Sequence, residues 1–228
     1  MHTVLGEMLY KGILQYLDDT LVYAKDEKEL ITRLDQLFAR LQRHNVKLHP
    51  GKFELYAESL TWGGKTVDGK GVRPSAQRLD AINDMPEPTT LAEMMSFVYG
   101  VAWFRGHLPY FAEVAAPLYD LWKVTMEPYS KKTTNRAKRF QLKDLAGWRD
   151  GGSKAYQEVK QLMADAVSNN YFDPELRLCV FSDASQEFYC LVFTQCEHGM
   201  ERLPWDQQVG KHVLLLVISG RFRHAQLR

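Results

Sequence analysis

Short apolar runs and one helical repeat organise the first third of the chain. Residues 13–17 and 21–24 are rich in aliphatic and aromatic side chains, and the polar residues between them predict two strands joined as a hairpin. Residues 27–44 repeat apolar side chains about every 3.6 positions, with basic side chains between them, which predicts an amphipathic helix. Residues 47–74 alternate apolar and polar positions and contain glycine turns, which predicts short strands.

Helical patterns dominate the middle of the chain. A helix is expected over residues 75–84, and the sequence Met-Pro-Glu-Pro that follows ends it. Thr89 or Thr90 is the expected N-cap of a second helix, with Glu93 as its partner in a capping box. This second helix is expected to reach about Phe104.

The rest of the chain contains ordered patterns on both sides of one polar stretch. A third helix is expected over residues 110–122. Residues 131–154 are polar and basic with few apolar side chains, so we interpret them as a linker or an extended surface connection. Helical spacing returns over residues 155–167, and residues 178–182 and 189–194 are expected to pair as a β-hairpin.

Composition limits the classes of protein to consider. The 228 residues are 45% hydrophobic and carry a formal net charge of +1, which favours a globular chain and excludes a uniformly basic nucleic-acid binder. No apolar run approaches the roughly 20 residues that span a bilayer, and the start of the chain lacks the pattern of a secretory signal. An intracellular protein, cytoplasmic or nuclear, is therefore expected.

The three cysteines, Cys179, Cys190 and Cys196, provide neither a disulfide framework nor a four-cysteine zinc site. Cys190, Cys196 and His198 suggest zinc, but a fourth ligand at a suitable spacing is absent, so buried structural thiols are the preferred interpretation. A Gly-Gly-Lys-Thr stretch resembles part of a phosphate-binding loop. Ser59 occupies the position of that motif's first glycine, so ATP binding is set aside.

Asp18 and Asp19 are adjacent carboxylates between the two strands of the first predicted hairpin. Neighbouring carboxylates disfavour each other's ionisation unless a cation lies against them. Mg²⁺ binds one or two protein carboxylates and completes its coordination with water and phosphate oxygens, so such a pair suits a nucleotide-bound metal in a two-metal phosphoryl-transfer centre. Ordinary turn chemistry, in which Asp is favoured for its local hydrogen bonds, is the alternative.

Three sequence landmarks follow one another in an order typical of one family. The first is "YLDD", followed by the amphipathic helix and "KLHPGKFELYAESLTWGG". The second is "RLDAINDMPEPTTLAEMMSFVYGVAWFRGHLPYFAEVAAPLYDLW", and the third is "CVFSDASQEFYCLVFTQ". Together they resemble the reverse transcriptase and tethered RNase H of Ty3/gypsy-type LTR retrotransposon Pol polyproteins, from the palm motif Tyr-X-Asp-Asp into the start of RNase H.

The resemblance implies an α+β fold in four parts. These are a partial palm with its primer-grip hairpin (residues 1–72), a thumb-like helical region (73–125), a connection with one helix (126–172) and a truncated RNase H-like domain (173–228). The last part departs from the family at Phe188 and Cys190, which occupy positions that are usually glycine, and their bulk bears on the geometry of the RNase H hairpin.

The resemblance also assigns roles to single residues. Asp18 would be a catalytic metal ligand of the polymerase site, with Asp19 as its companion carboxylate. Tyr16 and Leu17 would lie near the primer terminus and the incoming nucleotide. Asp183 would be the first metal carboxylate of the RNase H site, and its alternative is a loop aspartate that caps the next turn.

The second hairpin would contact nucleic acid through its backbone. Trp62, Gly63 and Gly64 fall on the primer grip of the family, where small residues let the backbone approach the phosphate chain closely. A plain β-turn is the alternative for the two glycines.

The activity implied by the resemblance is RNA-directed DNA polymerisation with RNase H cleavage. Its cofactor would be Mg²⁺, or Mn²⁺, and its partners an RNA or DNA template-primer and a deoxynucleoside triphosphate; no membrane partner is expected. The family also uses fingers, an earlier palm aspartate and later RNase H carboxylates, which these 228 residues lack. We therefore expect little or no activity from this chain alone. Whether a partner chain supplies the missing parts stays open.

Two further hypotheses belong to other classes. A non-catalytic nucleic-acid-binding remnant would use basic side chains for phosphate contacts and Trp103, Phe104 and Trp148 for stacking. Its basic side chains would be Lys131, Lys132, Arg136, Lys138, Arg139 and Lys143. A degenerate open reading frame would lack a stable fold, because the missing half of the palm leaves strand edges and apolar surface unpaired.

Overall fold

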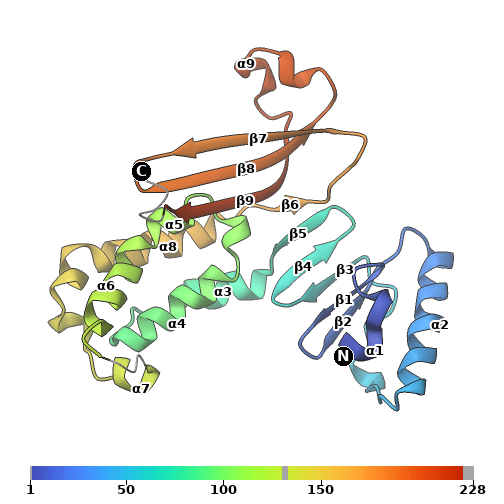
Figure 1. The fold of residues 1–228 in the computed structure, drawn as a ribbon, viewed down its shortest axis with the longest axis horizontal. Coiled ribbons are helices and arrows are strands. Elements are labelled where there is room, and N and C mark those ends of the chain that lie inside the picture. Colours follow the sequence, from blue (N-terminus) through green and yellow to red (C-terminus); the bar gives the residue numbers. More distant parts are fainter. Residues whose placement is uncertain (1, 130–132, 223–228) are drawn as a thin grey trace. The chain divides into compact units, whose positions relative to one another are not determined.

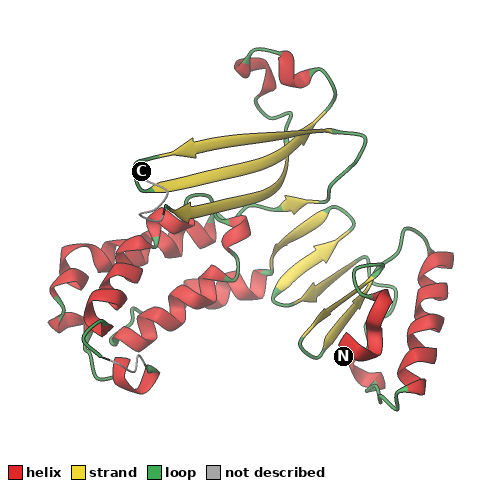
Figure 2. Cartoon of the chain, viewed as in Figure 1, coloured by secondary structure: helices red, strands yellow, loops and turns green. Residues whose placement is uncertain are grey.

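The computed structural model describes residues 2–129 and 133–222. Its contacts divide the chain into two compact units, Met1–Gly69 (unit 1) and Lys70–Arg228 (unit 2). Figures 1 and 2 show helices and strands in both units, which confirms the α+β class. The boundary after Gly69 lies close to the predicted end of the palm segment at residue 72, and the finer four-part division stays a prediction.

Unit 1 contains two antiparallel hairpins and one long helix. Its elements are α1 (His2–Leu5), β1 (Ile13–Tyr16), β2 (Asp19–Val22), α2 (Glu27–Arg43), β3 (Ser59–Trp62) and β4 (Lys65–Asp68). The helix predicted over residues 27–44 is confirmed. The first hairpin is tighter than the apolar runs indicate, because Asp19 already pairs with Tyr16 as a strand residue.

Capping and burial explain why α2 forms and where it lies. The side chain of Asp26 accepts a hydrogen bond from the backbone N–H of Glu29 at 2.8 Å, so the first turn has a capped N-terminus. Leu37 and Leu41 on one face of the helix join Ile13 of β1 in a small buried core. Since Ile13 belongs to this core, the helix fixes the hairpin that carries Asp18 and Asp19.

Unit 2 combines a helical core with a three-stranded sheet (Figure 1). Its helices are α3 (Ala76–Asn83), α4 (Leu91–Ala102), α5 (Phe111–Val114), α6 (Ala116–Met126), α7 (Thr134–Ala137), α8 (Ser153–Ala164) and α9 (Trp205–Gln208). Its strands are β5 (Gly71–Pro74), β6 (Asn169–Asn170), β7 (Arg177–Ala184), β8 (Phe188–Cys196) and β9 (Val213–Arg221). None of the described helices is long and apolar enough to cross a membrane.

The capping box predicted before α4 is present. The Thr90 hydroxyl accepts from the Glu93 backbone N–H at 3.3 Å, and the Glu93 carboxylate accepts from the Thr90 backbone N–H at 3.2 Å. Behind this cap, α4 buries most of its length in the core of unit 2. There Phe97 meets Tyr156 of α8, with their ring centroids 4.4 Å apart.

The polar, basic stretch over residues 131–154 is not an extended surface connection where the structure describes it. Ala137, Leu142 and Trp148 are buried in the same core as α4. Backbone hydrogen bonds also join this stretch to the start of α4, from the N–H of Leu142 to the carbonyl of Thr89 at 2.9 Å and from Leu91 to Phe140 at 3.1 Å. The few apolar residues in the stretch are therefore its anchors.

The hairpin predicted near the C-terminal end is confirmed and is longer than expected. β7 and β8 pair antiparallel from Arg177 with Cys196 to Ala184 with Tyr189, and β9 pairs with the other edge of β8. Bulk at Phe188 and Cys190 does not prevent this pairing. Cys190 lies opposite Asp183 within an unbroken register, so side-chain size at these positions leaves the hairpin intact.

Candidate metal and nucleic-acid sites

Asp18 and Asp19 lie at the tip of the β1–β2 hairpin. Tyr16 pairs with Asp19, so Leu17 and Asp18 form a two-residue turn, and both carboxylates are exposed. Leu17 has a positive φ of 50° and its side chain is 78% exposed. The side-chain amide of Gln15 donates to the Leu17 carbonyl at 2.6 Å and so braces the turn.

The chemistry of this tip suits a hard divalent cation, because carboxylate oxygens are ligands that Mg²⁺ prefers. Within the described residues neither Asp18 nor Asp19 forms an ion pair. The same part of the chain places no third acidic, histidine or cysteine side chain close enough to complete a cluster with them. The hairpin therefore offers two of the ligands that a metal centre needs.

The second hairpin of unit 1 turns through Gly63 and Gly64, with φ values of 58° and 78°. Two positive φ values in a two-residue loop are typical of a type I′ turn, which favours glycine. The rings of Tyr16 and Trp62 meet edge to face with centroids 6.0 Å apart, so the two hairpins of unit 1 contact each other. The indole N–H of Trp62 is buried without a hydrogen-bond partner in the described structure.

Asp183 lies near the end of β7, as predicted, and its side chain is exposed. The Tyr110 hydroxyl donates a hydrogen bond to its Oδ2 at 3.2 Å, and this bond is the main reason that the pKa of Tyr110 is raised. Tyr110 precedes α5 with a positive φ of 58°. Sequence reasoning missed this contact because 73 residues separate the partners, and the landmark that contains Tyr110 does not indicate that its hydroxyl meets Asp183.

An ionic cluster joins the sheet to α6 near the β7–β8 turn. Arg221 contacts Asp120 at 2.8 Å and Glu187 at 2.7 Å, and its guanidinium lies 5.4 Å from the centroid of the Phe188 ring. Phe188, which departs from the family pattern, is thus part of this contact surface.

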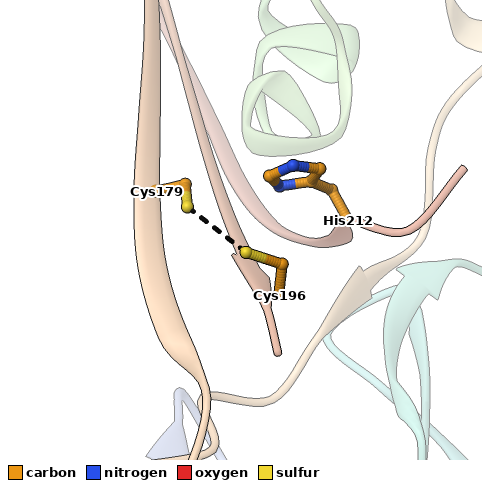
Figure 3. A group of neighbouring side chains, drawn as sticks. All are labelled: Cys179, Cys196 and His212. Atoms are coloured by element: carbon orange, nitrogen blue, oxygen red, sulfur yellow. Dashed lines mark hydrogen bonds between the residues drawn. The ribbon is translucent and has the colours of Figure 1, made fainter. Parts of the chain in front are cut away.

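The structure brings together a different set of thiols and histidines from the set Cys190, Cys196 and His198 that the sequence suggested. Cys179, Cys196 and His212 place their donor atoms within 4.8 Å of one another, and the two sulfur atoms are 3.6 Å apart (Figure 3). Cys190 and His198 are not part of this cluster. Burial, followed by the hydrogen bond with Cys179, raises the pKa of the Cys196 thiol to about 11.

Only some of the residues proposed for stacking and phosphate contacts in unit 2 are exposed. Phe104 and Trp148 are buried, so they offer no stacking face to a nucleic acid. The guanidinium of Arg136 lies over the Tyr129 ring at 4.5 Å from its centroid. Of the basic side chains proposed for phosphate contacts, Lys138, Arg139 and Lys143 are exposed, whereas Lys131 and Lys132 lie outside the described residues.

Comparisons with known proteins agree with the landmark order. No protein-family model matches the chain. The Retrovirus-related Pol polyprotein from transposon 412 of Drosophila melanogaster is 26% identical over 189 residues, covering 83% of this chain and 14% of the relative. The Transposon Tf2-3 polyprotein of Schizosaccharomyces pombe is 22% identical over 196 residues, covering 86% of this chain and 13% of the relative. The chain thus spans about one seventh of the length of these curated relatives.

Solved structures of similar fold match this chain over its whole length. A foamy viral protease-reverse transcriptase in complex with RNA/DNA hybrid matches with a TM-score of 0.65 and 19% identity, over 100% of this chain and 27% of that one. A foamy viral protease-reverse transcriptase dRH in complex with ds DNA matches with a TM-score of 0.69 and 19% identity, over 100% of this chain and 35% of that one. The resemblance inferred from the residues is confirmed: the chain has transposon polyproteins as its relatives and the fold of part of a protease-reverse transcriptase.

Proposed function

We propose that this chain is a segment of an RNA-directed DNA polymerase with tethered RNase H, and that Asp18 and Asp19 are its polymerase carboxylates. The observation that carries the proposal is the Tyr16–Asp19 turn, which presents two exposed carboxylates beside the glycine turn of the next hairpin. A polymerase uses such carboxylates to hold the divalent ions that stabilise charge during phosphoryl transfer.

Each residue of this site has a separate task in the proposal. Asp18 and Asp19 hold Mg²⁺, or Mn²⁺, which when bound stabilises the attacking and leaving oxygens. Tyr16 and Leu17 contact the primer end and the incoming nucleotide. The ring of Trp62 packs against Tyr16 and supports its position.

The second turn supplies backbone rather than side chains. Gly63 and Gly64 present no bulk, so the chain there can approach a phosphate chain closely. The similar foamy viral structures are complexes with an RNA/DNA hybrid and with double-stranded DNA, which supports a template-primer duplex as the partner. A deoxynucleoside triphosphate completes the proposed set of substrates.

Asp183 is proposed as the first metal carboxylate of the RNase H site. It is exposed near the end of β7, and its Oδ2 already accepts from the Tyr110 hydroxyl. A metal ion at Asp183 competes with that hydrogen bond, so Tyr110 would have to release the oxygen when the site is loaded.

The chain by itself is proposed to be inactive. Phosphoryl transfer depends on several charged groups acting together, and the described residues gather only two carboxylates at the hairpin tip. Primer extension by the purified chain with Mg²⁺ or Mn²⁺ tests this part of the proposal. We expect no extension above background, and robust extension abolished by Asp18→Asn would contradict it.

Metal binding at the tip of the β1–β2 hairpin can be tested without an activity assay. Paramagnetic Mn²⁺ is expected to broaden the amide signals of residues 17–20 in an NMR titration of the purified chain. The double variant Asp18→Asn/Asp19→Asn should lose this broadening, whereas Asp35→Asn, which removes an exposed carboxylate on α2, should keep it. Equal broadening in the wild type and the double variant would overturn the assignment of the carboxylates.

A non-catalytic nucleic-acid-binding role is the second candidate function. Lys138, Arg139 and Lys143 are exposed on one short stretch, which favours contacts with phosphates. This alternative predicts hybrid-duplex binding that falls steeply with salt and does not depend on Asp18 or Asp19. A degenerate chain without a stable fold predicts neither binding nor cooperative unfolding.

A further inference from the structure

The three strands of the C-terminal sheet bring two thiols and an imidazole together at one end of the sheet (Figure 3). Cys179 pairs across the sheet with Thr194, and Cys196 lies two residues further along β8 on the same face. His212 immediately precedes β9, which pairs with the other edge of β8. Strands β7 and β8 and the residue that leads into β9 thus each contribute one donor to a single cluster.

The separation of the sulfur atoms fits a bound metal. Two thiolates that each lie about 2.3 Å from Zn²⁺ in a tetrahedral site are about 3.8 Å apart, and the two sulfurs here are 3.6 Å apart. The third donor lies within 4.8 Å of both, so the imidazole needs to move by only about 1 Å to reach ligand distance.

A disulfide fits this geometry less well. Cys179 and Cys196 are diagonal neighbours across an antiparallel pair. The Cα atoms of such neighbours are about 7–8 Å apart, whereas disulfides span Cα separations of about 4.4–6.8 Å. A cation between the sulfur atoms requires no such approach of the backbones.

The hydrogen bonds of His212 leave the nitrogen Nδ1 available to a metal. The amide nitrogen of Gln208 donates to the Leu203 carbonyl, which turns its Oε1 toward Nε2 of His212 at 3.1 Å. Nε2 therefore carries the proton and donates to Gln208. Nδ1 has a lone pair, which accepts from the Thr194 hydroxyl at 2.9 Å, and that hydroxyl can rotate away.

The contact between His212 and Gln208 has the form of an outer-shell interaction in a metal site. Histidines that bind metals usually donate their other ring N–H to an oxygen acceptor, which fixes the tautomer and the ring orientation. The edge of Phe181 also lies against the ring, with centroids 5.1 Å apart. The imidazole is therefore held from two sides while Nδ1 is left for the ligand role.

We propose that Cys179, Cys196 and His212 form a binding site for a soft or borderline divalent cation, with Zn²⁺ as the preferred ion. Thiolate and imidazole ligands select Zn²⁺ over the hard Mg²⁺ of the proposed polymerase site. Three protein ligands leave a fourth tetrahedral position for water or another donor. Cys196 ends β8 and His212 precedes β9, so the two residues flank the segment that connects these strands and contains α9. A bound ion would therefore link both ends of this connecting segment to Cys179 on β7.

Cobalt spectroscopy of the reduced, full-length chain tests the proposal. One equivalent of Co²⁺ should give the visible bands of a tetrahedral site and the charge-transfer absorption of cobalt thiolate, and Zn²⁺ should displace it. Cys179→Ser, Cys196→Ser and His212→Gln should each weaken binding by more than about 100-fold, since even outer-shell changes cost about 10–100-fold. Gln208→Ala should weaken binding by about 10–100-fold.

Cys190→Ser is the matched control, because Cys190 is a buried thiol on the same strand outside the cluster. It should give the same cobalt-thiolate charge-transfer absorption with Co²⁺ as the wild type does. Octahedral Co²⁺ bands without thiolate absorption, or an equal loss of binding in Cys190→Ser, would overturn the proposal.

The wild-type chain provides a test that does not depend on variants that fold. Zn²⁺ should slow the alkylation of Cys179, the more exposed thiol of the cluster, as followed by mass spectrometry. Unchanged alkylation in the presence of excess Zn²⁺, or a Cys179–Cys196 disulfide that persists in reducing buffer, would contradict a metal site.

Discussion

At the scale of single residues, Leu17 is the position where local preference and structure disagree most clearly. Leu17 has a φ of 50° and an exposed side chain, so no burial of apolar surface offsets the free-energy cost of its left-handed backbone. Such conformations cluster at functional sites, where surrounding contacts hold them in place. Here the pairing of Tyr16 with Asp19 closes the turn and fixes where the two carboxylates lie.

Leu17→Gly is expected to stabilise unit 1 by about 0.5–1 kcal/mol. Relief of the left-handed strain, about 1–2 kcal/mol, exceeds the entropy that glycine adds to the unfolded chain. Urea denaturation of the purified chain measures the difference. Leu17→Ala is the control, because it removes the side chain and keeps the strain, so a similar gain in that variant would show that strain is not the cause.

At the scale of elements, end caps and turn residues explain which predictions succeed. α2 and α4 each begin at a side chain that accepts a hydrogen bond from the first turn, and both helices were predicted. The turn at Gly63 and Gly64 was predicted for a similar reason, because glycine tolerates positive φ. The short helix α7 was not predicted, since its four residues give no periodic signal.

The cap of α4 should make stability depend on pH. Hydrogen bonds to the Glu93 carboxylate, first from the Thr89 backbone, lower its pKa from the usual 4.5. A lowered pKa contributes stability that is present above the unfolded value and is lost as the pH falls through the folded one. Glu93→Gln should therefore be less stable than the wild type at pH 7, and the difference should shrink in acid.

Thermal unfolding between pH 7 and pH 3 measures this effect. Thr90→Ala serves as a companion variant that should cost about 1 kcal/mol through loss of the N-cap. If the difference between Glu93→Gln and the wild type stays constant down to pH 3, the Glu93 carboxylate does not act through its ionised form.

At the scale of the whole molecule, the basic stretch within residues 133–152 belongs to the core of unit 2. Ala137, Leu142 and Trp148 are spaced too irregularly to register as a helix or a strand. Their burial depends on surfaces supplied by α4, α6 and α8, which lie elsewhere along the chain. Composition therefore indicates a connector where packing produces an anchored segment.

Trp148→Ala tests this packing. Removal of a buried tryptophan in contact with Tyr156 should cost about 3–5 kcal/mol of the free energy of unfolding of unit 2. Trp205→Ala, at a site that is 62% exposed, should cost about 1 kcal/mol or less. Hydrogen exchange of the amides of α4 measures the stability of unit 2. If the two variants destabilise unit 2 equally, the stretch that contains Trp148 is a surface connector after all.

The sequence by itself determined the local elements of this protein and the order of its landmarks. The helical repeat of α2, the capping box at Thr90 and the Tyr-X-Asp-Asp motif are encoded within a few neighbouring residues, so periodicity and spacing reveal them. Only the tertiary structure decided that Tyr110 meets Asp183 and that His212 joins Cys179 and Cys196. Those contacts depend on strand register and on packing between segments far apart in the chain, which local residue preferences do not specify.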